Sequence, residues 1–600
     1  MAIGLLATSC RLTPTADPGP GPEAAITAFA AALGSGDTAA AAALTSDPAA
    51  AAVTLSAVWS SLAPSALAVR TDQVSRTGRG AAQVAADYTW TLPGGASWAY
   101  RGGWTLRRSG PDTAPRWLVA WSPADVHPQL ADAQLLELRR LPAATGRLRD
   151  RNDQLLVAPV RVYSIVLRPD QVTDVPGTAG TLAAVLSPLD PTVTPAAVTA
   201  GLRGATPVTG YTVTNLREDD YRRLKPRLDA IRGLTAPSQL RNLPPSRNFA
   251  GMLLGQLAPT VTRLTTGRPG WRVVSVDATG EDLLTLGEQP AQDGPDVVLT
   301  LDTVTQLTAE SVIAGVPQPS VLVAIQPSTG DILAVAQNRA ADQLGPIALT
   351  GLYPPCSTFK IVTAAAAVDA GLITPTTPVP CPGTTVLGGE VVNNYHRFDL
   401  GTVPASLAFA KSCNTTFATL SSRMAPDALP RAARSYGIGV DFAIPGITTL
   451  TGRVPAGPTA AQRAENGFGQ GVVLVTPFGE AMMAATVAHG SMPTPRIIRG
   501  TATVVTGAGL APSAAARAAL PTLMRAVVTE GTGIDLKDIG TSYLKTGTAE
   551  FTRADGTRHA HAWSTGYTAD LAYVIMTVGG DSSGPTARLS RSFVVGALPR

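Results

Sequence analysis

The pattern of apolar and polar residues divides this chain of 600 residues into three parts. In the first part, EAAITAFAAAL has apolar residues at helical spacing, and residues 84–92 and 98–104 alternate as in strands. A third strand-like run, RWLVAWS, ends near Trp121. A helix followed by a curved antiparallel sheet predicts a small α+β domain over residues 21–125. Its aromatic residues stand at strand spacing, so we expect them to form a core rather than a binding face.

The second part, residues 140–290, has mixed patterns. It opens with the charged turn GRLRDRNDQLLV, and LREDDYRRLKPRLDAIRGL is typical of a charged, exposed helix. We find no cluster of catalytic side chains here. The sequence therefore favours a spacer or docking role for this part.

The third part, residues 297–600, begins with a strand and a helix that starts near Asp302. A β-hairpin follows, with strands at 321–325 and 332–336 around a Ser-Thr-Gly-Asp turn. Alanine-rich helical segments fill the middle, and strands return in SYLKTGTAE, HAWSTGYT and LAYVIMTV. Strands at both ends with helices between them predict one sheet built from segments that are distant in sequence.

Composition excludes two classes of protein. Hydrophobic residues make up 45% of the chain and charged residues 15%, which is typical of a globular protein. The formal net charge is only +4 and no long basic run occurs, so we expect no nucleic-acid partner. Beyond the N-terminus, no long apolar run predicts a transmembrane helix.

The N-terminal segment MAIGLLATSC resembles the end of a lipoprotein signal, in which small residues precede a lipidated cysteine, here Cys10. It lacks a basic region, which favours a start codon further upstream. The alternative is an ordinary chain start with an incidental cysteine. Lipidation would make residues 1–20 a signal remnant and tether, and would anchor the protein on the outer face of the cell membrane.

The remaining cysteines are Cys356, Cys381 and Cys413. No CxxC spacing occurs, so we expect no zinc site, and no other motif implies a metal or a cofactor. In an exported protein Cys381 can pair with Cys413. The sequence favours the other alternative, three free and half-buried thiols.

A lysine follows a serine by three positions in the segment STFK, which holds Ser357 and Lys360. Only five of the 47 basic residues in the chain are lysines. The run after Pro355 predicts a helix that ends at Gly371, so both side chains share one helix face. A serine hydroxyl becomes a nucleophile only when a base takes its proton, and a desolvated lysine can do this whereas an arginine cannot.

Two later segments show which class of enzyme the Ser357–Lys360 pair indicates. KSCNTTF contains Ser412 and Asn414, and YLKTGTAE contains Lys545 in the sequence Lys-Thr-Gly. SxxK, SxN and KTG in this order are the signature of penicillin-recognising serine enzymes. The sequence therefore predicts Ser357 as the nucleophile and Lys360 as its base.

Each remaining motif residue has a physical role in this prediction. Lys545 supplies a second cation, which lowers the proton affinity of Lys360 and attracts a substrate carboxylate. Gly547 allows backbone or ligand to approach its strand closely. The hydroxyls of Thr546 and Thr548 can bind the carboxylate.

The same prediction covers the developing oxyanion and the leaving group. The backbone N–H groups of Ser357 and Thr548 are expected to form the oxyanion hole. Ser412 can relay a proton to the leaving amine, and Asn414 can orient both the substrate amide and the lysine.

With these motifs, the chain resembles a class B penicillin-binding protein, in particular the penicillin-binding lipoproteins with a MecA-type, NTF2-like N-terminal domain. The resemblance implies a multidomain α+β fold: an NTF2-like cone over 21–125, a dimerisation or pedestal domain over 140–290, and a transpeptidase domain over 297–600. The last is expected to be a β-lactamase-like antiparallel sheet flanked by helices. Lesser motifs of the family are present as GFGQG, EGTG and HAWSTGY, whereas GRLRDRNDQLLV departs from the family's entry to the pedestal at several positions.

The resemblance also implies a function. Ser357 would attack the penultimate D-alanine of a peptidoglycan stem peptide, release the terminal D-alanine, and pass the acyl group to an amine of a neighbouring peptide. β-Lactams would acylate the same serine. A membrane glycosyltransferase and proteins of the divisome or elongasome are the expected partners.

Two other functions use the same residues. A D,D-carboxypeptidase or β-lactamase would hydrolyse the acyl-enzyme, and Glu465 and Glu550 are candidates for a base by position only, with a structural role favoured for each. A non-catalytic penicillin-binding sensor would be acylated without turnover. A Ser-His-Asp enzyme is disfavoured, although His559 and His561 flank a predicted surface turn from which they can contact substrate.

Overall fold

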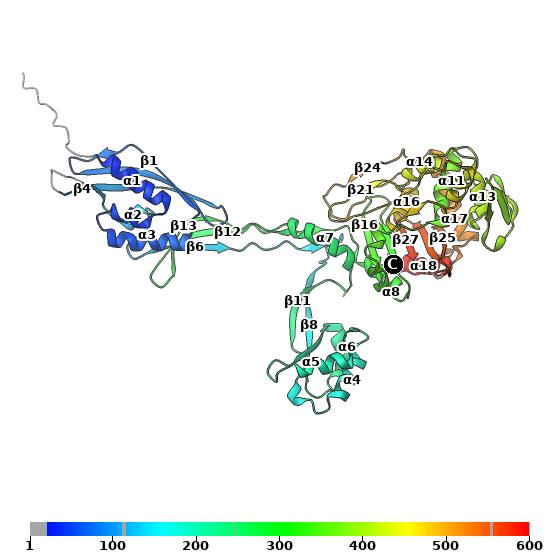
Figure 1. Ribbon diagram of the computed structural model, residues 1–600, viewed down its shortest axis with the longest axis horizontal. Helices are drawn as coiled ribbons and strands as arrows, with labels where there is room; N and C mark the ends of the chain where they lie inside the picture. Colours follow the sequence, from blue (N-terminus) through cyan, green and yellow to red (C-terminus); the bar gives the residue numbers. More distant parts are fainter. Residues whose placement is uncertain (1–20, 111–115, 247, 553–555, 599–600) are drawn as a thin grey trace, which may run out of the picture. The chain divides into compact units, whose positions relative to one another are not determined.

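The computed structural model describes residues 21–110, 116–246, 248–552 and 556–598, which form two compact units. Unit 1 comprises the chain to Thr145 together with Thr266–Gly294. Unit 2 comprises Gly146–Thr265 and Pro295–Arg600. Figure 1 shows their elements. The prediction of a lipidated Cys10 lies outside the described residues.

Unit 1 begins with three helices and an antiparallel sheet. The helices are α1 (Pro22–Ser35), α2 (Thr38–Ala43) and α3 (Pro48–Leu62). The strands are β1 (Ala66–Thr71), β2 (Ser75–Arg76), β3 (Ala81–Thr91), β4 (Ser97–Ser109) and β5 (Arg116–Val119). Their order is β1-β3-β4-β5, with β2 beside β3. The predicted helix and antiparallel sheet are therefore confirmed.

The aromatic residues of this sheet face its helices and form the core. Trp90 and Trp104 are almost completely buried, and the Trp104 ring meets Phe29 of α1 edge-on at 4.8 Å. The Trp104 indole N–H donates to the Tyr88 hydroxyl at 2.7 Å. The predicted core role of these side chains is confirmed, and burial with a satisfied polar group explains it.

A second sheet of unit 1 joins distant parts of the chain. It contains β6 (Leu135–Leu141), β12 (Gly270–Val276) and β13 (Asp282–Gln289), in the order β13-β12-β6. β12 pairs with the whole of β6, from Gly270 opposite Leu141 to Val276 opposite Leu135. Because of this pairing, the part of the chain from 140 to 290 is divided between the two units.

Between these strands the chain builds a separate small core in unit 2. Its sheet contains β8 (Ala158–Leu167), β9 (Tyr211–Arg217), β10 (Leu234–Thr235) and β11 (Ser238–Leu243). Its helices are α4 (Val175–Leu186), α5 (Pro195–Arg203) and α6 (Glu218–Leu228). α6 buries Leu224 and Leu228 and exposes most of its charged residues, as its sequence predicts.

The remainder of unit 2 is organised around one five-stranded antiparallel sheet in the order β16-β15-β27-β26-β25. Its strands are β15 (Ser320–Ile325), β16 (Ile332–Gln337), β25 (Ser542–Thr552), β26 (Arg558–Thr568) and β27 (Leu571–Thr577). The prediction of one sheet built from both ends of this region is confirmed.

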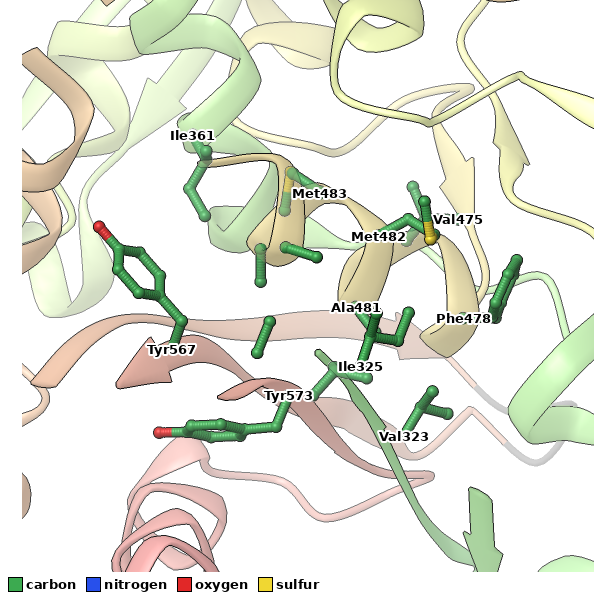
Figure 2. Packing of buried hydrophobic residues seen from close by; sticks show 14 of the residues in the cluster. Val323, Ile325, Ile361, Val475, Phe478, Ala481, Met482, Met483, Tyr567 and Tyr573 are labelled. Carbon is green, nitrogen blue, oxygen red and sulfur yellow. The ribbon is translucent and has the colours of Figure 1, made fainter. Parts of the chain in front are cut away.

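Helices cover both faces of this sheet. Neighbouring residues of a strand point to opposite faces, and on β26 Ser564 contacts Ser590 of α18 (Ser583–Ala597) whereas Thr565 contacts Glu480 of α16 (Pro477–His489). α16 is the more deeply buried helix. Figure 2 shows Phe478, Ala481 and Met482 lying over β15.

The other elements of unit 2 connect and surround these layers. They include the helices α7 (Gly251–Thr265), α8 (Thr303–Ala314), α9 (Arg339–Asp342), α10 (Ile347–Thr350), α11 (Lys360–Asp369), α12 (Ala405–Ala410), α13 (Asn414–Ser422), α14 (Ala428–Ser435), α15 (Ala460–Gly467) and α17 (Ala514–Glu530). The short strands include β7 (Leu148–Arg149), β14 (Val297–Val298), β17 (Pro378–Cys381), β18 (Thr384–Leu387), β19 (Glu390–Asn393), β20 (Gly401–Pro404), β21 (Asp441–Ala443), β22 (Gly452–Arg453), β23 (Leu474–Val475) and β24 (Val504–Thr506). The predicted helix start at Asp302 is confirmed, because its side chain caps α8.

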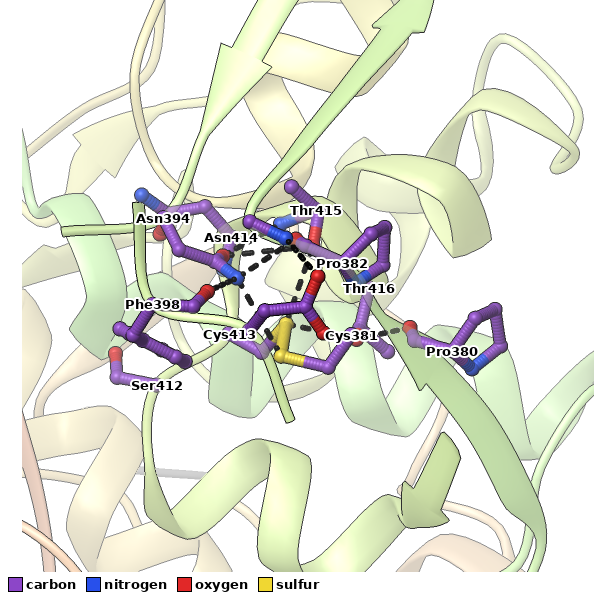
Figure 3. The surroundings of a disulfide bond; sticks show 12 residues. Pro380, Cys381, Pro382, Asn394, Phe398, Ser412, Cys413, Asn414, Thr415 and Thr416 are labelled. Atoms are coloured by element: carbon purple, nitrogen blue, oxygen red, sulfur yellow. Dashed lines mark hydrogen bonds between the residues drawn. A yellow bond between two sulfur atoms is a disulfide. The ribbon is translucent and has the colours of Figure 1, made fainter. Parts of the chain in front are cut away.

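Cys381 and Cys413 form a disulfide, with Cα atoms 6.1 Å apart (Figure 3). The expectation of three free thiols is therefore wrong for these two, while Cys356 is free and buried. The cause is local topology: Cys381 ends β17, which pairs with β20, and α12 leads from β20 back to Cys413. Among the helices that the structure describes, none has the length and hydropathy needed to cross a bilayer.

Candidate active site

The predicted nucleophile lies on a short 3-10 turn, η3 (Cys356–Phe359), that leads into α11. The helix begins at Lys360, three residues later than the sequence predicts. Ser357 is 8% exposed and Lys360 is fully buried. Lys360 Nζ lies 3.0 Å from Ser357 Oγ. The turn thus leaves a small part of Ser357 exposed and buries its predicted base completely.

The SxN segment lies directly against this lysine. Lys360 Nζ lies 2.8 Å from the carbonyl oxygen of Ser412, 3.2 Å from Ser412 Oγ and 2.7 Å from Asn414 Oδ1. Ser412 has a φ of +63°, in the left-handed region that few residues adopt. This conformation lets one residue offer both its carbonyl and its hydroxyl to the same amine.

The KTG segment closes the other side of the site. Lys545, on β25, is fully buried, and its Nζ lies 3.0 Å from Ser412 Oγ and 2.8 Å from the carbonyl of Thr546. Ser412 Oγ therefore stands between the two lysines. The Thr546 hydroxyl is paired at 2.6 Å with the hydroxyl of Thr532, and Thr548 is partly exposed.

Gly547 explains how β25 approaches the nucleophile turn so closely. A Cβ at this position would lie 2.8 Å from the carbonyl oxygen of Pro355 and 3.2 Å from the backbone nitrogen of Thr358. Real Cβ atoms show no such contacts with rigid backbone. The strand and the turn can lie this close only because residue 547 has no side chain.

The two buried lysines have unusual proton affinities. Burial, with a further contribution from the charge of Lys545, holds the pKa of Lys360 well below its usual value. Burial lowers the pKa of Lys545 to about 7. A lysine whose pKa is lowered in this way and whose amine lies 3.0 Å from a hydroxyl can, in its neutral form, accept the proton of that hydroxyl.

A buried carboxyl group beside the nucleophile turn is absent from our sequence prediction. Glu480 of α16 is completely buried, and its two oxygens accept from the hydroxyls of Thr358 at 2.9 Å and Thr565 at 2.8 Å. Burial raises its pKa to about 7. The one signal in the sequence is a single charged residue inside the apolar run PFGEAMMAATVA.

The other predicted candidates lie at the margin of the site. His561 is buried between the rings of Phe551 and Tyr353, and burial lowers its pKa to about 4. His559 Nδ1 lies 3.1 Å from Asp581 Oδ1. Glu465 is half-buried and Glu550 is exposed.

Comparisons with known proteins identify two domains in the chain. Residues 320–589 match the family model of the penicillin binding protein transpeptidase domain, and residues 21–134 match that of the NTF2-like N-terminal transpeptidase domain. The chain thus contains the transpeptidase domain of the penicillin-binding proteins. The predicted multidomain α+β fold, with an NTF2-like domain and a transpeptidase domain, is thereby confirmed.

Curated relatives share the region of the motifs. Peptidoglycan D,D-transpeptidase PbpA of Mycobacterium tuberculosis strain H37Rv is 33% identical over 209 residues, which are 29% of this chain and 42% of the relative. Peptidoglycan D,D-transpeptidase MrdA of Acinetobacter baumannii is 28% identical over 274 residues, 40% of each chain. The chain thus spans less than half the length of these relatives.

Solved structures share the fold. A chain from the complex between PBP2 and MreC of Helicobacter pylori superposes with a TM-score of 0.54 at 17% identity, covering 77% of this chain and 100% of that one. A chain from a study of polymerization and crosslinking by a peptidoglycan synthase complex gives 0.55 at 23% identity, covering 78% and 92%. At these identities the likeness shows the fold alone.

Proposed function

We propose that the protein is a peptidoglycan D,D-transpeptidase that works through an acyl-enzyme at Ser357. The observation that carries this proposal is the buried amine of Lys360, 3.0 Å from Ser357 Oγ, with a second buried lysine on the other side of Ser412. Relatives that share the motif region bear the name of this activity. The two alternatives, a hydrolase (D,D-carboxypeptidase or β-lactamase) and a penicillin-binding sensor without turnover, would begin with the same acylation of Ser357.

The first step is proton transfer from Ser357. A neutral amine has two N–H groups and one lone pair. The closest two acceptors of Lys360, Asn414 Oδ1 and the Ser412 carbonyl, take its N–H groups, so the lone pair faces Ser357 Oγ and receives the hydroxyl proton. The alkoxide then attacks the penultimate D-alanine carbonyl of a stem peptide.

The bond to the terminal D-alanine breaks in the second step. Its nitrogen takes the proton from Lys360 through the Ser412 hydroxyl, which lies 3.2 Å from Lys360 Nζ and 3.0 Å from Lys545 Nζ. Backbone N–H groups of Ser357 and Thr548 stabilise the oxyanion, a contribution worth roughly 10²- to 10³-fold in rate per donor. An amine of a neighbouring stem peptide then takes the acyl group and frees the serine.

Substrate recognition is assigned to the KTG strand. The charge of Lys545 and the hydroxyls of Thr546 and Thr548 bind the terminal carboxylate of the stem peptide, and the same groups bind the carboxylate of a β-lactam. Gly547 lets this strand lie against the nucleophile turn, which keeps these groups close to Ser357. A β-lactam acylates Ser357 and keeps its ring amine attached, so no leaving group departs and the acyl-enzyme persists.

The test of this proposal is acylation of the full chain by a fluorescent penicillin. Ser357→Ala must abolish labelling because no acyl acceptor remains. Lys360→Arg must also abolish it, because arginine keeps the charge but cannot accept the proton. Full labelling of Lys360→Arg would refute the proton-transfer mechanism. Product analysis of a stem-peptide substrate, with and without an acceptor amine, then separates transfer from hydrolysis.

We further propose that the protein works on the outer face of the cell membrane, anchored by a lipid at Cys10. The disulfide between Cys381 and Cys413 supports an oxidising compartment. Metabolic labelling with a fatty acid, lost in Cys10→Ala, tests the anchor. In this setting its partners are a membrane glycosyltransferase and proteins of the elongasome or divisome.

A further inference from the structure

A buried asparagine from another segment holds the start of the helix that carries Asn414. Asn394 follows β19 and is 3% exposed. Its Oδ1 accepts from the backbone N–H groups of Asn414 at 2.8 Å and Thr415 at 3.1 Å (Figure 3). The residue at the N-cap of α13, Cys413, makes no side-chain cap. Asn394 therefore supplies the cap that the helix lacks.

The orientation of the Asn394 amide is fixed from its other end. Its Nδ2 donates to the carbonyl oxygens of Pro382 and Phe398, each at 2.9 Å. The oxygen thus faces only donors and the nitrogen faces carbonyls, so a flipped amide would lose every one of these bonds. The side chain is a rigid connection between the 382–398 segment and α13.

The same segment also orients the Asn414 side chain. Asn414 Nδ2 donates to the backbone carbonyl of residue 393 at 3.0 Å, which leaves its Oδ1 facing Lys360 Nζ at 2.7 Å. Residues 393 and 394 therefore fix both the backbone and the amide of Asn414. A shift of α13 would move the oxygen that receives one N–H of the lysine.

We infer that Asn394 is a positioning residue for acylation, which acts through Asn414 to aim the lone pair of Lys360 at Ser357. This inference rests on the proposed function. Lysine has a flexible four-carbon side chain, so its amine direction depends on its acceptors. Without a fixed Asn414 Oδ1 the amine can rotate, and the fraction of molecules with the lone pair toward Ser357 Oγ falls.

The experiment is a double-mutant cycle on the full chain. Rates of acylation by a fluorescent penicillin are measured for wild type, Asn394→Ala, Asn414→Ala and the double variant. We expect Asn394→Ala to slow the first-order acylation step about 10- to 100-fold, with little change in the preceding binding constant. In the Asn414→Ala background the same substitution should have no further effect, because its route to the lysine is already broken.

Asn338 provides a matched control. It is also buried, at 6% exposure against 3% for Asn394, and its Oδ1 likewise accepts from two backbone N–H groups, those of Ala341 and Ser320, both at 3.0 Å. Its Nδ2 donates to the carbonyls of Val316 and Gln318, and it contacts none of the site residues. Asn338→Ala should lower the melting temperature as Asn394→Ala does, yet leave the acylation rate within about twofold of wild type.

Each outcome decides the inference. A loss in Asn394→Ala that disappears in the Asn414→Ala background supports it. Losses that multiply in the double variant, or an equal loss in Asn338→Ala, would make Asn394 merely structural and overturn it. A wild-type rate in Asn394→Ala overturns it while the proposed function stands, whereas absent labelling of wild type overturns both. Where Asn394→Ala does not fold, the same cycle is measured with Asn394→Ser and judged by the same outcomes. Serine is too short to reach both the N–H groups of α13 and the carbonyls of Pro382 and Phe398.

Discussion

Substituting Gly547 by alanine tests whether the close approach of β25 to the nucleophile turn is required for acylation. The added methyl group would lie 2.8 Å from the Pro355 carbonyl oxygen, whereas ordinary contact begins at 3.4 Å, so the gap must widen by about 0.6 Å. The gap cannot widen freely, because the Trp563 indole on the neighbouring strand donates to the carbonyl of Pro354 at 3.1 Å.

The expected cost has two parts. Overpacking of this kind destabilises a protein by roughly 1–3 kcal/mol. A displacement of up to about 1 Å between reacting groups can cost about 10²-fold in rate. We therefore expect Gly547→Ala to slow acylation by a fluorescent penicillin about 10- to 100-fold, because the strand carrying Lys545 moves away from Ser357.

The assay is the second-order acylation rate constant, measured by stopped labelling and gel fluorescence, with the melting temperature recorded in parallel. Gly315→Ala is the control, because nothing lies within 4 Å of a Cβ at position 315 and its φ is an ordinary −85°. It should retain the wild-type rate. If Gly547→Ala is folded and acylates as fast as wild type, the argument that β25 must touch the turn is wrong.

Three further predictions concern the surroundings of the site. Replacing both Cys381 and Cys413 by serine opens a loop of 32 residues and should lower stability by about 4 kcal/mol, measured by calorimetry. Acylation should rise with pH as Lys360 loses its proton and fall again above about pH 7, where Lys545 loses the charge that attracts the carboxylate; a flat profile contradicts this assignment. Glu480→Leu leaves the Thr565 hydroxyl without its acceptor, while the Thr358 hydroxyl keeps the carbonyl of Pro355 at 2.9 Å, and it should cost about 2 kcal/mol. Glu480→Gln, which keeps an oxygen, should melt nearer to wild type.

The sequence could predict the features that local chemistry determines. The motif residues are recognisable because acyl transfer needs a particular residue type at each position. In the structure their side chains form a continuous series of contacts, from Ser357 to Lys360, from Lys360 to Ser412 and from Ser412 to Lys545. The strands of the central sheet were predictable from alternation and from apolar runs. The catalytic roles of the motif residues stay predictions that acylation measurements test.

Features that depend on contacts between distant segments could not be predicted. In the sequence, Asn394 resembles an ordinary loop residue, because no pattern near it indicates that it contacts α13. The role of Glu480 depends on its hydrogen bonds with Thr358 and Thr565, which come from a turn and a strand that are distant in sequence. The division of residues 140–290 follows from the pairing of β12 with β6, a long-range event without a local signal.

The order of strands in the central sheet has a consequence for biogenesis. β15 is made early, but its neighbour β27 is made last, and Ser320 meets Thr577 across 257 positions. Until that neighbour emerges from the ribosome or translocon, a strand that is apolar from Val321 to Ile325 has an open hydrogen-bonding edge. The nascent protein therefore needs protection from aggregation over this interval, and a chain ended by a stop codon before position 542 would keep that edge permanently.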